Sequence, residues 1–434
     1  MTPDSMQKSP AHANGFVEPQ PSAPSAGSPP AHRPGFWERL FRWSFPTFPV
    51  PLTILLWNGE EFATTPGVPI ASVRFRERSA FLGALLNPDL GFGDGYTDGR
   101  IEVEGDLVAF LETAFRLPKP PAFIQFLRRL LTGWRLRPSA NSLKRSRRNI
   151  SHHYDLSNDF YQLWLDEQMV YTCAYFPTPD ATLEEAQAAK MDHVCRKVWL
   201  RPGETVVEAG CGWGSLGRHM AKHYGVRVKA FNISHEQIRY ARDRAKAEGL
   251  DGRVEYIEDD YRNITGQYDA FVSVGMLEHV GVDHYRELGG VIRRSLKPDG
   301  RGLVHSIGRN YPEPTSPWLE KRIFPGSYMP SLGEMTGVFE PCGLSILDVE
   351  NLRLHYAKTL DHWLRRFEAS ADRIEQMFDR RLVRAYRLYL AASMVSFLVG
   401  SIQLFQIVCA PAASNEIPWS RAYVYDRPAG IVTR

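Results

Sequence analysis

The chain has 434 residues, which is long enough for two domains and a large hydrophobic core. Its hydrophobic content of 43% and charged content of 23% are those of an ordinary globular protein, and a net charge of +3 is too small by itself to indicate a polyanion-binding protein. The five cysteines are widely spaced and form no C-x-x-C pair, which argues against a disulfide framework and a zinc site and favours a reducing cytosol.

The first 34 residues are predicted to be a disordered tail, because they contain eight prolines and almost nothing apolar. They also lack the apolar run of a signal peptide. Residues 35–140 form a predicted smaller N-terminal domain. Its opening stretch, GFWERLFRWSF, could form an amphipathic helix or simply pack within the domain. The stretch NPDLGFGDGYTDGRIEVEGD is rich in Gly and Asp and predicts turns that join short strands.

A strongly basic stretch ends this region. Residues 113–154 contain ten Lys or Arg residues and no Asp or Glu. Phe, Leu and Trp residues lie within and just before the basic cluster at residues 128–148, so three interpretations are open: a solvated helix face, an anionic membrane surface or nucleic acid. No nucleic-acid-binding motif accompanies the charge, so we expect a lipid- or membrane-associated domain and no nucleic-acid partner.

From about residue 200 onward, apolar strand patterns alternate with helix patterns. The predicted strands are TVVEAG, VRVKAFNI, RVEYIED, YDAFVSVGM and GLVHSIG. This alternation predicts parallel strands joined by crossover helices in a doubly wound α/β sheet. Residues 309–340, with many Pro and Gly, predict an insertion or lid. The uncharged residues 388–410 have a membrane-spanning length, but polar residues interrupt them, so we expect a buried helix and a core strand.

The sharpest motif is VVEAGCGWG, residues 206–214. Gly210, Gly212 and Gly214 lie between a predicted strand and a predicted helix, where the chain must turn tightly and a ligand can contact backbone. The spacing is not the G-x-G-x-x-G of dinucleotide binding, and the Lys of a phosphate-binding P-loop is absent. The turn therefore suits a nucleoside with a small charged tail, for which S-adenosylmethionine is the obvious candidate.

Polar side chains follow the next two strands. Ser234 begins SHEQ, an S-x-x-Q capping box that would start a helix and fix Asn232 at the carboxyl edge of the sheet. Asn232 and Gln237 could reach a ribose or the methionine tail, and Asp260 in DDY could accept from an adenine amino group. Each of these residues alone is more often a capped or solvated loop position. Together with the glycine turn, they make three successive strand ends at the ligand-binding edge of an open sheet, which favours a ligand site.

The stretch SVGMLEHVG places Glu278 and His279 at the end of an apolar strand. A buried, unpaired carboxylate is costly, so Glu278 is either solvated at a loop or held for a purpose. We assign His279 to structure. The spacing of His279, His284 and His305 fits no usual set of metal ligands, so no metal site is predicted.

Nine segments, in order over about residues 150–370, resemble the cyclopropane-fatty-acyl-phospholipid synthase family, which includes the mycolic acid cyclopropane synthases. These segments are HHYDLSNDFYQLWLD, MVYTCAYF, TLEEAQAAKMDHVCRKVWL, VVEAGCGWG, NISHEQ, VSVGMLEHVG, LVHSIG, IFPGSYMPSL and HYAKTLDHW. The resemblance implies a seven-stranded, Rossmann-like methyltransferase domain over residues 141–434. It implies methyl transfer from S-adenosylmethionine to a cis double bond of a phospholipid acyl chain, then loss of a proton and closure of a cyclopropane ring.

The resemblance also implies roles for individual residues. Tyr171, Thr172 and Tyr261 would join the cofactor site. Tyr175 and Phe176 could supply aromatic faces to the carbocation. Bicarbonate is the implied base, and its implied holders are Cys173, Glu278, His305, the backbone of Ile307, and Tyr356.

Some positions depart from the family pattern. Glu208 stands where Asp is usual, and Asn232 stands where Thr is common. Ser393 stands where some relatives have a cysteine, so no catalytic role can rest on it. Relatives with nearly the same motifs make other products. The alternatives are therefore a fatty-acyl methyltransferase with a methyl-branched or methylene product and, from a different class, a catalytically dead membrane lipid-binding protein.

The implied partners are an unsaturated phospholipid and an anionic membrane surface, with a possible homodimer. The implied location is cytoplasmic, peripherally associated with the inner face of the membrane.

Overall fold

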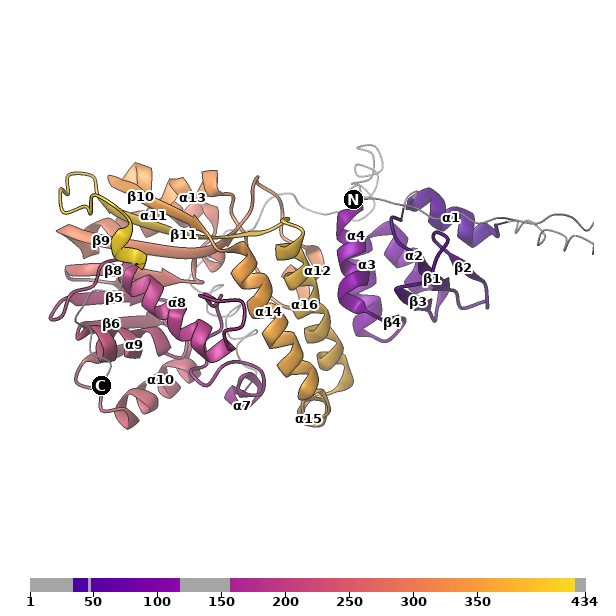
Figure 1. Cartoon of the computed structure of the whole chain (residues 1–434), viewed down its shortest axis with the longest axis horizontal. Helices are drawn as coiled ribbons and strands as arrows, with labels where there is room; N and C mark the ends of the chain where they lie inside the picture. The colour runs from indigo at the N-terminus through magenta and orange to yellow at the C-terminus, as the bar shows by residue number, and fades with distance from the viewer. Residues whose placement is uncertain (1–33, 46–47, 118–156, 426–434) are drawn as a thin grey trace, which may run out of the picture.

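The computed structural model describes residues 34–45, 48–117 and 157–425 (Figure 1). The tail before residue 34 and the basic cluster at residues 128–148 lie outside these residues, so their predicted roles remain predictions. A large α/β part and a smaller N-terminal domain lie at opposite ends of the view in Figure 1, with helices α12, α14 and α16 between them.

The larger sheet confirms the predicted doubly wound fold. Its strand order is β10-β11-β9-β8-β5-β6-β7. Strands β5 to β9 pair in parallel, whereas β11 is antiparallel to both of its neighbours, β9 and β10. The strands are β5 (Thr205–Ala209), β6 (Arg227–Asn232), β7 (Val254–Glu258), β8 (Tyr268–Val274), β9 (Leu296–Gly308), β10 (Leu344–Asn351) and β11 (Gln403–Pro411).

Helices cover both faces of this sheet. Consecutive strand residues point to opposite sides, so each strand contributes side chains to both layers. Val206 and Val207 are neighbours in β5, yet they belong to separate hydrophobic cores. The core around Val206 includes side chains of α8 (Leu183–Lys197), α9 (Ser215–Tyr224) and α10 (His235–Ala247). The core around Val207 includes side chains of α11 (Tyr285–Ser295) and α13 (Leu332–Phe339).

The uncharged residues 388–410 form a buried helix end and a core strand, as predicted. They fall in α16 (Arg380–Leu398) and β11, and all nine residues of β11 are buried. Helix α16 packs beside α14 (Arg353–Ala369), and α15 (Ala371–Met377) connects them. Within the described ranges, no helix has the length and apolar character needed to cross a membrane.

The N-terminal domain has its own four-stranded sheet, in the order β2-β1-β3-β4. The strands are β1 (Leu52–Leu55), β2 (Glu61–Ala63), β3 (Ala71–Phe75) and β4 (Ile101–Gly105). The helices are α1 (Phe36–Ser44), α2 (Arg78–Leu86), α3 (Pro88–Thr97) and α4 (Leu107–Arg116). The stretch FWERLFRWS is therefore a helix, and its Phe41 packs against the rings of Phe48 and Phe62 inside the domain. Phe36 and Trp43 of the same helix are exposed.

The prediction that residues 87–106 form turns between short strands is wrong over residues 88–97, which form α3. Asn87 caps this helix through its side chain, and Pro88 occupies the first turn. The glycines serve packing. A Cβ on Gly91 would lie 2.2 Å from the Gly83 carbonyl oxygen in α2, and one on Gly93 would lie 2.3 Å from the Trp318 ring. Tertiary contacts therefore require Gly at helical positions where propensity disfavours it.

Residues 309–340, predicted as an insertion or lid, follow β9 and contain α12 (Pro317–Arg322) and α13. Part of this segment lines a cavity, as described below.

Candidate active site

The glycine turn after β5 borders a cavity at the carboxyl edge of the sheet. Gly210, Gly212 and Gly214 have φ values of 82°, 53° and 79°, which favour glycine. No heavy atom lies within 4 Å of a Cβ built on Gly212, a residue that lines the cavity. A Cβ on Gly214 would lie 2.6 Å from the Tyr256 ring, and Gly214 is not among the described lining residues. Gly210 and Gly212 are thus placed to contact a ligand, whereas Gly214 allows close helix packing.

The cofactor cavity, as we call it, has two adjoining lobes of about 120 and 60 Å³. The lobes share Gly210, Asn232, Met276 and His279. Of the other predicted cofactor residues, the larger lobe is lined by Tyr171, Thr172, Gly212 and Gln237, and the smaller lobe is lined by Asp260 and Tyr261. Residues from four strand ends and from the segment before α8 therefore meet at one place.

The predicted capping box at Ser234 forms only in part. The Ser234 hydroxyl accepts from the Gln237 backbone N–H at 3.5 Å. The Gln237 side chain accepts instead from the Asn232 amide at 2.7 Å. The two polar residues predicted to reach the ligand thus hold each other in place on the cavity wall.

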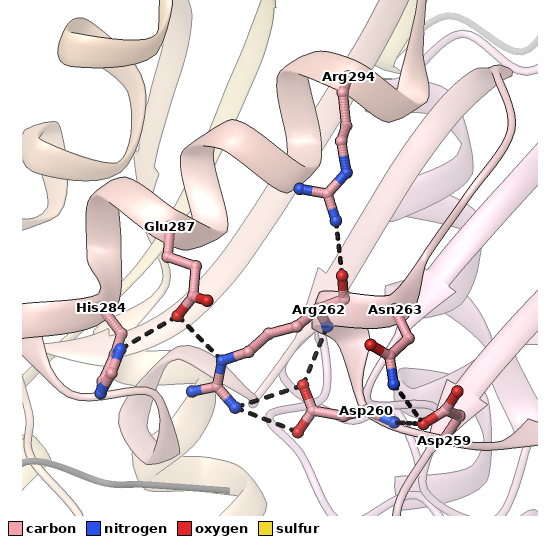
Figure 2. Close-up of polar contacts among 7 residues, drawn as sticks. All are labelled: Asp259, Asp260, Arg262, Asn263, His284, Glu287 and Arg294. Atoms are coloured by element: carbon pink, nitrogen blue, oxygen red, sulfur yellow. Dashed lines mark hydrogen bonds and ion pairs between the residues drawn. The ribbon is translucent and has the colours of Figure 1, made fainter.

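Asp260 is fixed by an ionic network at the end of β7 (Figure 2). Its carboxylate accepts from the Arg262 backbone N–H at 3.0 Å and pairs with the Arg262 guanidinium at 3.2 Å. Arg262 also donates to Glu287 at 3.0 Å, and Glu287 lies 3.1 Å from the His284 ring. Arg294 donates to the Arg262 carbonyl. Asp260 therefore lines the smaller lobe as a paired carboxylate, which limits its freedom to accept from an adenine amino group.

A larger cavity of about 560 Å³ adjoins the cofactor cavity. This size lies within the ~300–1,000 Å³ of typical ligand pockets. The two cavities share Tyr171, Thr172, Gly275 and His279. Aromatic side chains of Phe324, Tyr356, Tyr389 and Phe397 also line the larger cavity.

Glu278 lies on the wall of the larger cavity, in the turn after β8. Its Oε1 accepts from the Ile307 backbone N–H at 2.6 Å, and its backbone carbonyl accepts from the Tyr328 N–H at 2.9 Å. Its Oε2 is buried and has no hydrogen-bond partner among the described residues. Burial raises the pKa of Glu278 to about 7. The carboxyl group thus lies on the cavity wall, held there through Oε1 by the Ile307 backbone.

The structure brings some of the predicted base-holding residues together. Glu278, Ile307 and Tyr356 line the larger cavity, but the Ile307 N–H donates to Glu278, so these two predicted holders pair with each other. Cys173 and His305 are buried and are not among the described residues that line the cavity. The Cys173 thiol donates to the Ala174 carbonyl at 3.1 Å. Burial lowers the pKa of His305 well below its ordinary value, so its ring is neutral.

The aromatic faces are not those expected from the sequence. Tyr175 stacks between His193 and His355, with ring centroids 4.3 and 4.7 Å away. Phe176 stacks on His362 at 5.4 Å. Neither residue lines the larger cavity. Tyr171 and Tyr389 do, and their hydroxyl groups lie 2.9 Å apart.

Three ionisable residues that were not predicted as site residues also line these cavities. His279, assigned to structure, lines both cavities, and burial lowers its pKa to about 4. Glu208 and Lys190 line the cofactor cavity. Burial raises the pKa of Glu208 to about 7 and lowers that of Lys190 to about 8, and the Lys190 ammonium donates to the Thr172 hydroxyl at 2.9 Å. Two of these residues could have been noticed in the sequence, because a charged residue interrupts an apolar pattern there. Glu208 interrupts β5, and Lys190 lies on the buried face of α8.

No group of His, Cys, Asp and Glu side chains suited to a metal ion occurs in the described part of the chain. All five cysteines are free thiols.

Two family models match this chain. The model described as mycolic acid cyclopropane synthetase matches residues 141–407, and a model described as a domain of unknown function matches residues 36–121.

Among curated relatives, the "Probable fatty acid methyltransferase" of Pseudomonas putida is 35% identical over 391 residues, which cover 87% of this chain and 96% of the relative. The "Cyclopropane-fatty-acyl-phospholipid synthase" of Escherichia coli K12 is 36% identical over 355 residues, or 81% of this chain and 91% of the relative. Among solved structures, the cyclopropane synthase MmaA2 of Mycobacterium tuberculosis is 29% identical with a TM-score of 0.58. The match covers 61% of this chain and 98% of that structure.

Proposed function

The chain belongs to the mycolic acid cyclopropane synthetase family of S-adenosylmethionine-dependent methyltransferases, and we propose that it converts a cis double bond of a phospholipid acyl chain into a cyclopropane ring. One observation carries this proposal. The cofactor cavity meets a large, partly aromatic cavity at Tyr171, Thr172, Gly275 and His279. A methyl donor and an acyl chain would meet at that junction, beside the buried Glu278.

S-adenosylmethionine supplies the electrophilic methyl group when it is bound. An alkene is a weak nucleophile, so the walls of the junction must hold the reacting groups close and in line. Gly210, Gly212, Asn232 and Gln237 would hold the cofactor, and transfer of its methyl group to the alkene would leave positive charge on the acyl chain. Loss of a proton from the added methyl then lets its C–H electron pair close the ring.

The side chains of the larger cavity suit this chemistry. The rings of Tyr171, Tyr356 and Tyr389 present π-electrons that stabilise a nearby cation. Exclusion of water by the bound acyl chain would prevent capture of the cation as an alcohol. Glu278 provides a carboxyl group with a pKa of about 7, which is suited to proton transfer near neutral pH.

We also propose bicarbonate as the base that takes this proton. The residues present fit such an ion. Glu278 Oε2 has no partner among the described residues, so it could accept from a bicarbonate hydroxyl. Tyr356 lines the same cavity and could donate to a bicarbonate oxygen. Cys173 and His305 would complete the site only if the ion sits deeper than the larger cavity reaches.

The proposal includes peripheral association with the anionic inner face of the membrane, where phospholipid substrate is available. The basic cluster at residues 128–148 supports it, because basic residues near an anionic surface contribute about 1 kcal/mol each. Leu86, which lines the larger cavity, is 52% exposed, so apolar surface reaches the outside at this point. A cytoplasmic location and a homodimer belong to the same proposal.

A second product is favoured by the names of two relatives. The Pseudomonas putida relative is called a probable fatty acid methyltransferase, and a 35% identical relative from Mycobacterium tuberculosis is called a tuberculostearic acid methyltransferase. Under this alternative, the same site would leave a methyl branch or a methylene group in place of a ring.

Mass spectrometry of lipids from a host that expresses the protein tests the proposal. A ring or a methylene group adds the mass of one CH₂ to an unsaturated chain, and a saturated methyl branch adds two further hydrogens. Fragmentation then separates a ring from a methylene group. Unchanged phospholipid chains in a host with abundant soluble enzyme would contradict the proposal, and modified free fatty acids alone would contradict the phospholipid substrate.

A further inference from the structure

The wall of the larger cavity includes part of the N-terminal domain. We call residues 86–89, where the end of α2 meets the start of α3, the corner. Leu86, Asn87, Pro88 and Asp89 all line the cavity. The other walls come from the methyltransferase part, including Glu278. A segment that belongs to a separate sheet thus completes the space in which the proposed acyl chain would lie.

The corner is a rigid structure. Asn87 ends α2 and also caps α3: its backbone N–H donates to the Gly83 carbonyl at 2.9 Å, and its side chain accepts from the Leu90 N–H at 3.2 Å. Pro88 fixes φ at the first helical position. Gly83 and Gly91 let α2 and α3 approach so closely that a Cβ on Gly91 has no room. The position of Leu86 is therefore set by the domain fold.

The corner is also joined directly to the methyltransferase part. The Asp89 carboxylate accepts from the Ser316 hydroxyl at 2.9 Å and from the Trp318 N–H at 3.4 Å, at the start of α12. One turn further along α3, Asp94 forms a two-point ion pair with Arg322 at 2.9 and 2.8 Å. Ser316 lines the same cavity, so the joint and the wall are continuous.

A second joint lies between α16 and the domain. The buried Arg384 guanidinium donates to the Ile101 carbonyl at 2.7 Å and lies 4.3 Å above the Tyr96 ring. Arg381 pairs with Asp98 at 2.8 Å. Helix α16 itself contributes Tyr389 and Ser393 to the cavity. Both joints therefore fix the corner relative to helices that line the cavity.

From these contacts we infer that the corner determines which unsaturated acyl chains the enzyme accepts. The inference rests on the proposed function and assigns a role to the domain of unknown function at residues 36–121. Leu86 and Pro88 limit the space on one side of the cavity, and so limit the length of chain that can lie beyond the double bond. The match to the cyclopropane synthase MmaA2 covers 98% of that structure but only 61% of this chain. Much of this chain therefore has no counterpart in MmaA2.

Internal competition between two substrates tests the inference with the full-length enzyme. Vesicles would contain equal amounts of phosphatidylglycerol with palmitoleoyl chains and phosphatidylglycerol with oleoyl chains, which differ by two methylene groups on the methyl side of the double bond. The ratio of the two products, measured by mass spectrometry at low conversion, does not depend on how much enzyme is active. The variants are Leu86→Trp and Leu86→Ala. The control is Val68→Trp, which places the same ring at an 88% exposed position of the same domain.

We expect Leu86→Trp to shift the product ratio at least about fivefold toward the shorter chain, and Leu86→Ala to shift it toward the longer chain. One methylene changes selectivity by about 10–200-fold in an enclosed pocket, and the partial exposure of Leu86 reduces the effect. Val68→Trp should keep the wild-type ratio.

Ratios within about twofold of wild type for both Leu86 variants would overturn the inference. If Leu86→Trp makes no product, the ratio from Leu86→Ala decides alone. A wild-type enzyme that modifies neither lipid would instead refute the proposed function.

Discussion

Replacing Glu278 by Gln separates the catalytic role of this carboxyl group from its effect on stability. The substitution keeps the side-chain volume and the acceptor for the Ile307 N–H, but it puts an amide N–H₂ where Oε2 lies without a partner among the described residues. The amide N–H₂ would then face the hydroxyl of the proposed bicarbonate, and two donors cannot form a hydrogen bond with each other. Turnover should fall by about 10²-fold or more, the scale of a lost acid–base contribution, and cofactor affinity should stay near wild type.

The same substitution should change how stability depends on pH. Burial raises the pKa of Glu278 from 4.5 to about 7, so between these values the folded protein binds the proton that the unfolded chain has lost. The wild type therefore loses stability as pH rises through this window. At 1.36 kcal/mol per pH unit, the full loss is about 3 kcal/mol. Gln does not titrate and avoids this loss, although its buried N–H₂ carries a pH-independent penalty of about 1–3 kcal/mol.

Urea denaturation at pH 5 and pH 8 measures the difference. The free energy of unfolding of Glu278→Gln, relative to wild type, should rise by about 2–3 kcal/mol between the two pH values. The control Glu340→Gln makes the same charge change at an exposed position, and we expect no such rise. A relative stability of Glu278→Gln that does not change with pH would refute the burial argument. Full activity of the variant, or loss of cofactor binding with normal residual turnover, would refute the catalytic role.

Three further predictions concern the other parts of the site. Gly212→Val should abolish S-adenosylmethionine binding in calorimetry with the fold retained. The control Gly249→Val, at another left-handed glycine with open space around it, should bind normally. Equal binding by both variants would contradict the cofactor site. Tyr356→Phe should lower turnover less than Glu278→Gln, because it removes one donor from the cavity, and turnover below that of Glu278→Gln would contradict this ranking. Binding to anionic vesicles should weaken with salt, since exposed charges are screened over about 8 Å at physiological ionic strength. Replacing Arg145, Arg147 and Arg148 by Gln should weaken it too. Equal binding to neutral vesicles would argue against a membrane role for the basic cluster.

The sequence by itself determined the methyltransferase sheet and most of the cofactor cavity. Strand and helix periods are local properties, so the alternation from β5 to β9 could be read directly. The glycine turn and the polar strand ends were also readable, because parallel strands bring their carboxyl ends to one edge of the sheet. Even there, the partners were not readable: Gln237 bonds to Asn232 instead of completing the capping box, and Asp260 pairs with Arg262.

Only the tertiary structure decided the rest of the site. Residues 88–97 form a helix although they are rich in glycine. The glycines are needed because α2 and Trp318 lie too close to Gly91 and Gly93 for any side chain there. Local sequence does not encode such contacts between separate segments. For the same reason, Tyr175 stacks between two histidines while Tyr389, more than two hundred residues away, lines the cavity. The corner at residues 86–89 lines the proposed acyl-chain cavity because Asp89 and Asp94 bond to the segment around α12. Which side chains share a cavity depends on how the domains pack, and packing is a property of the whole chain.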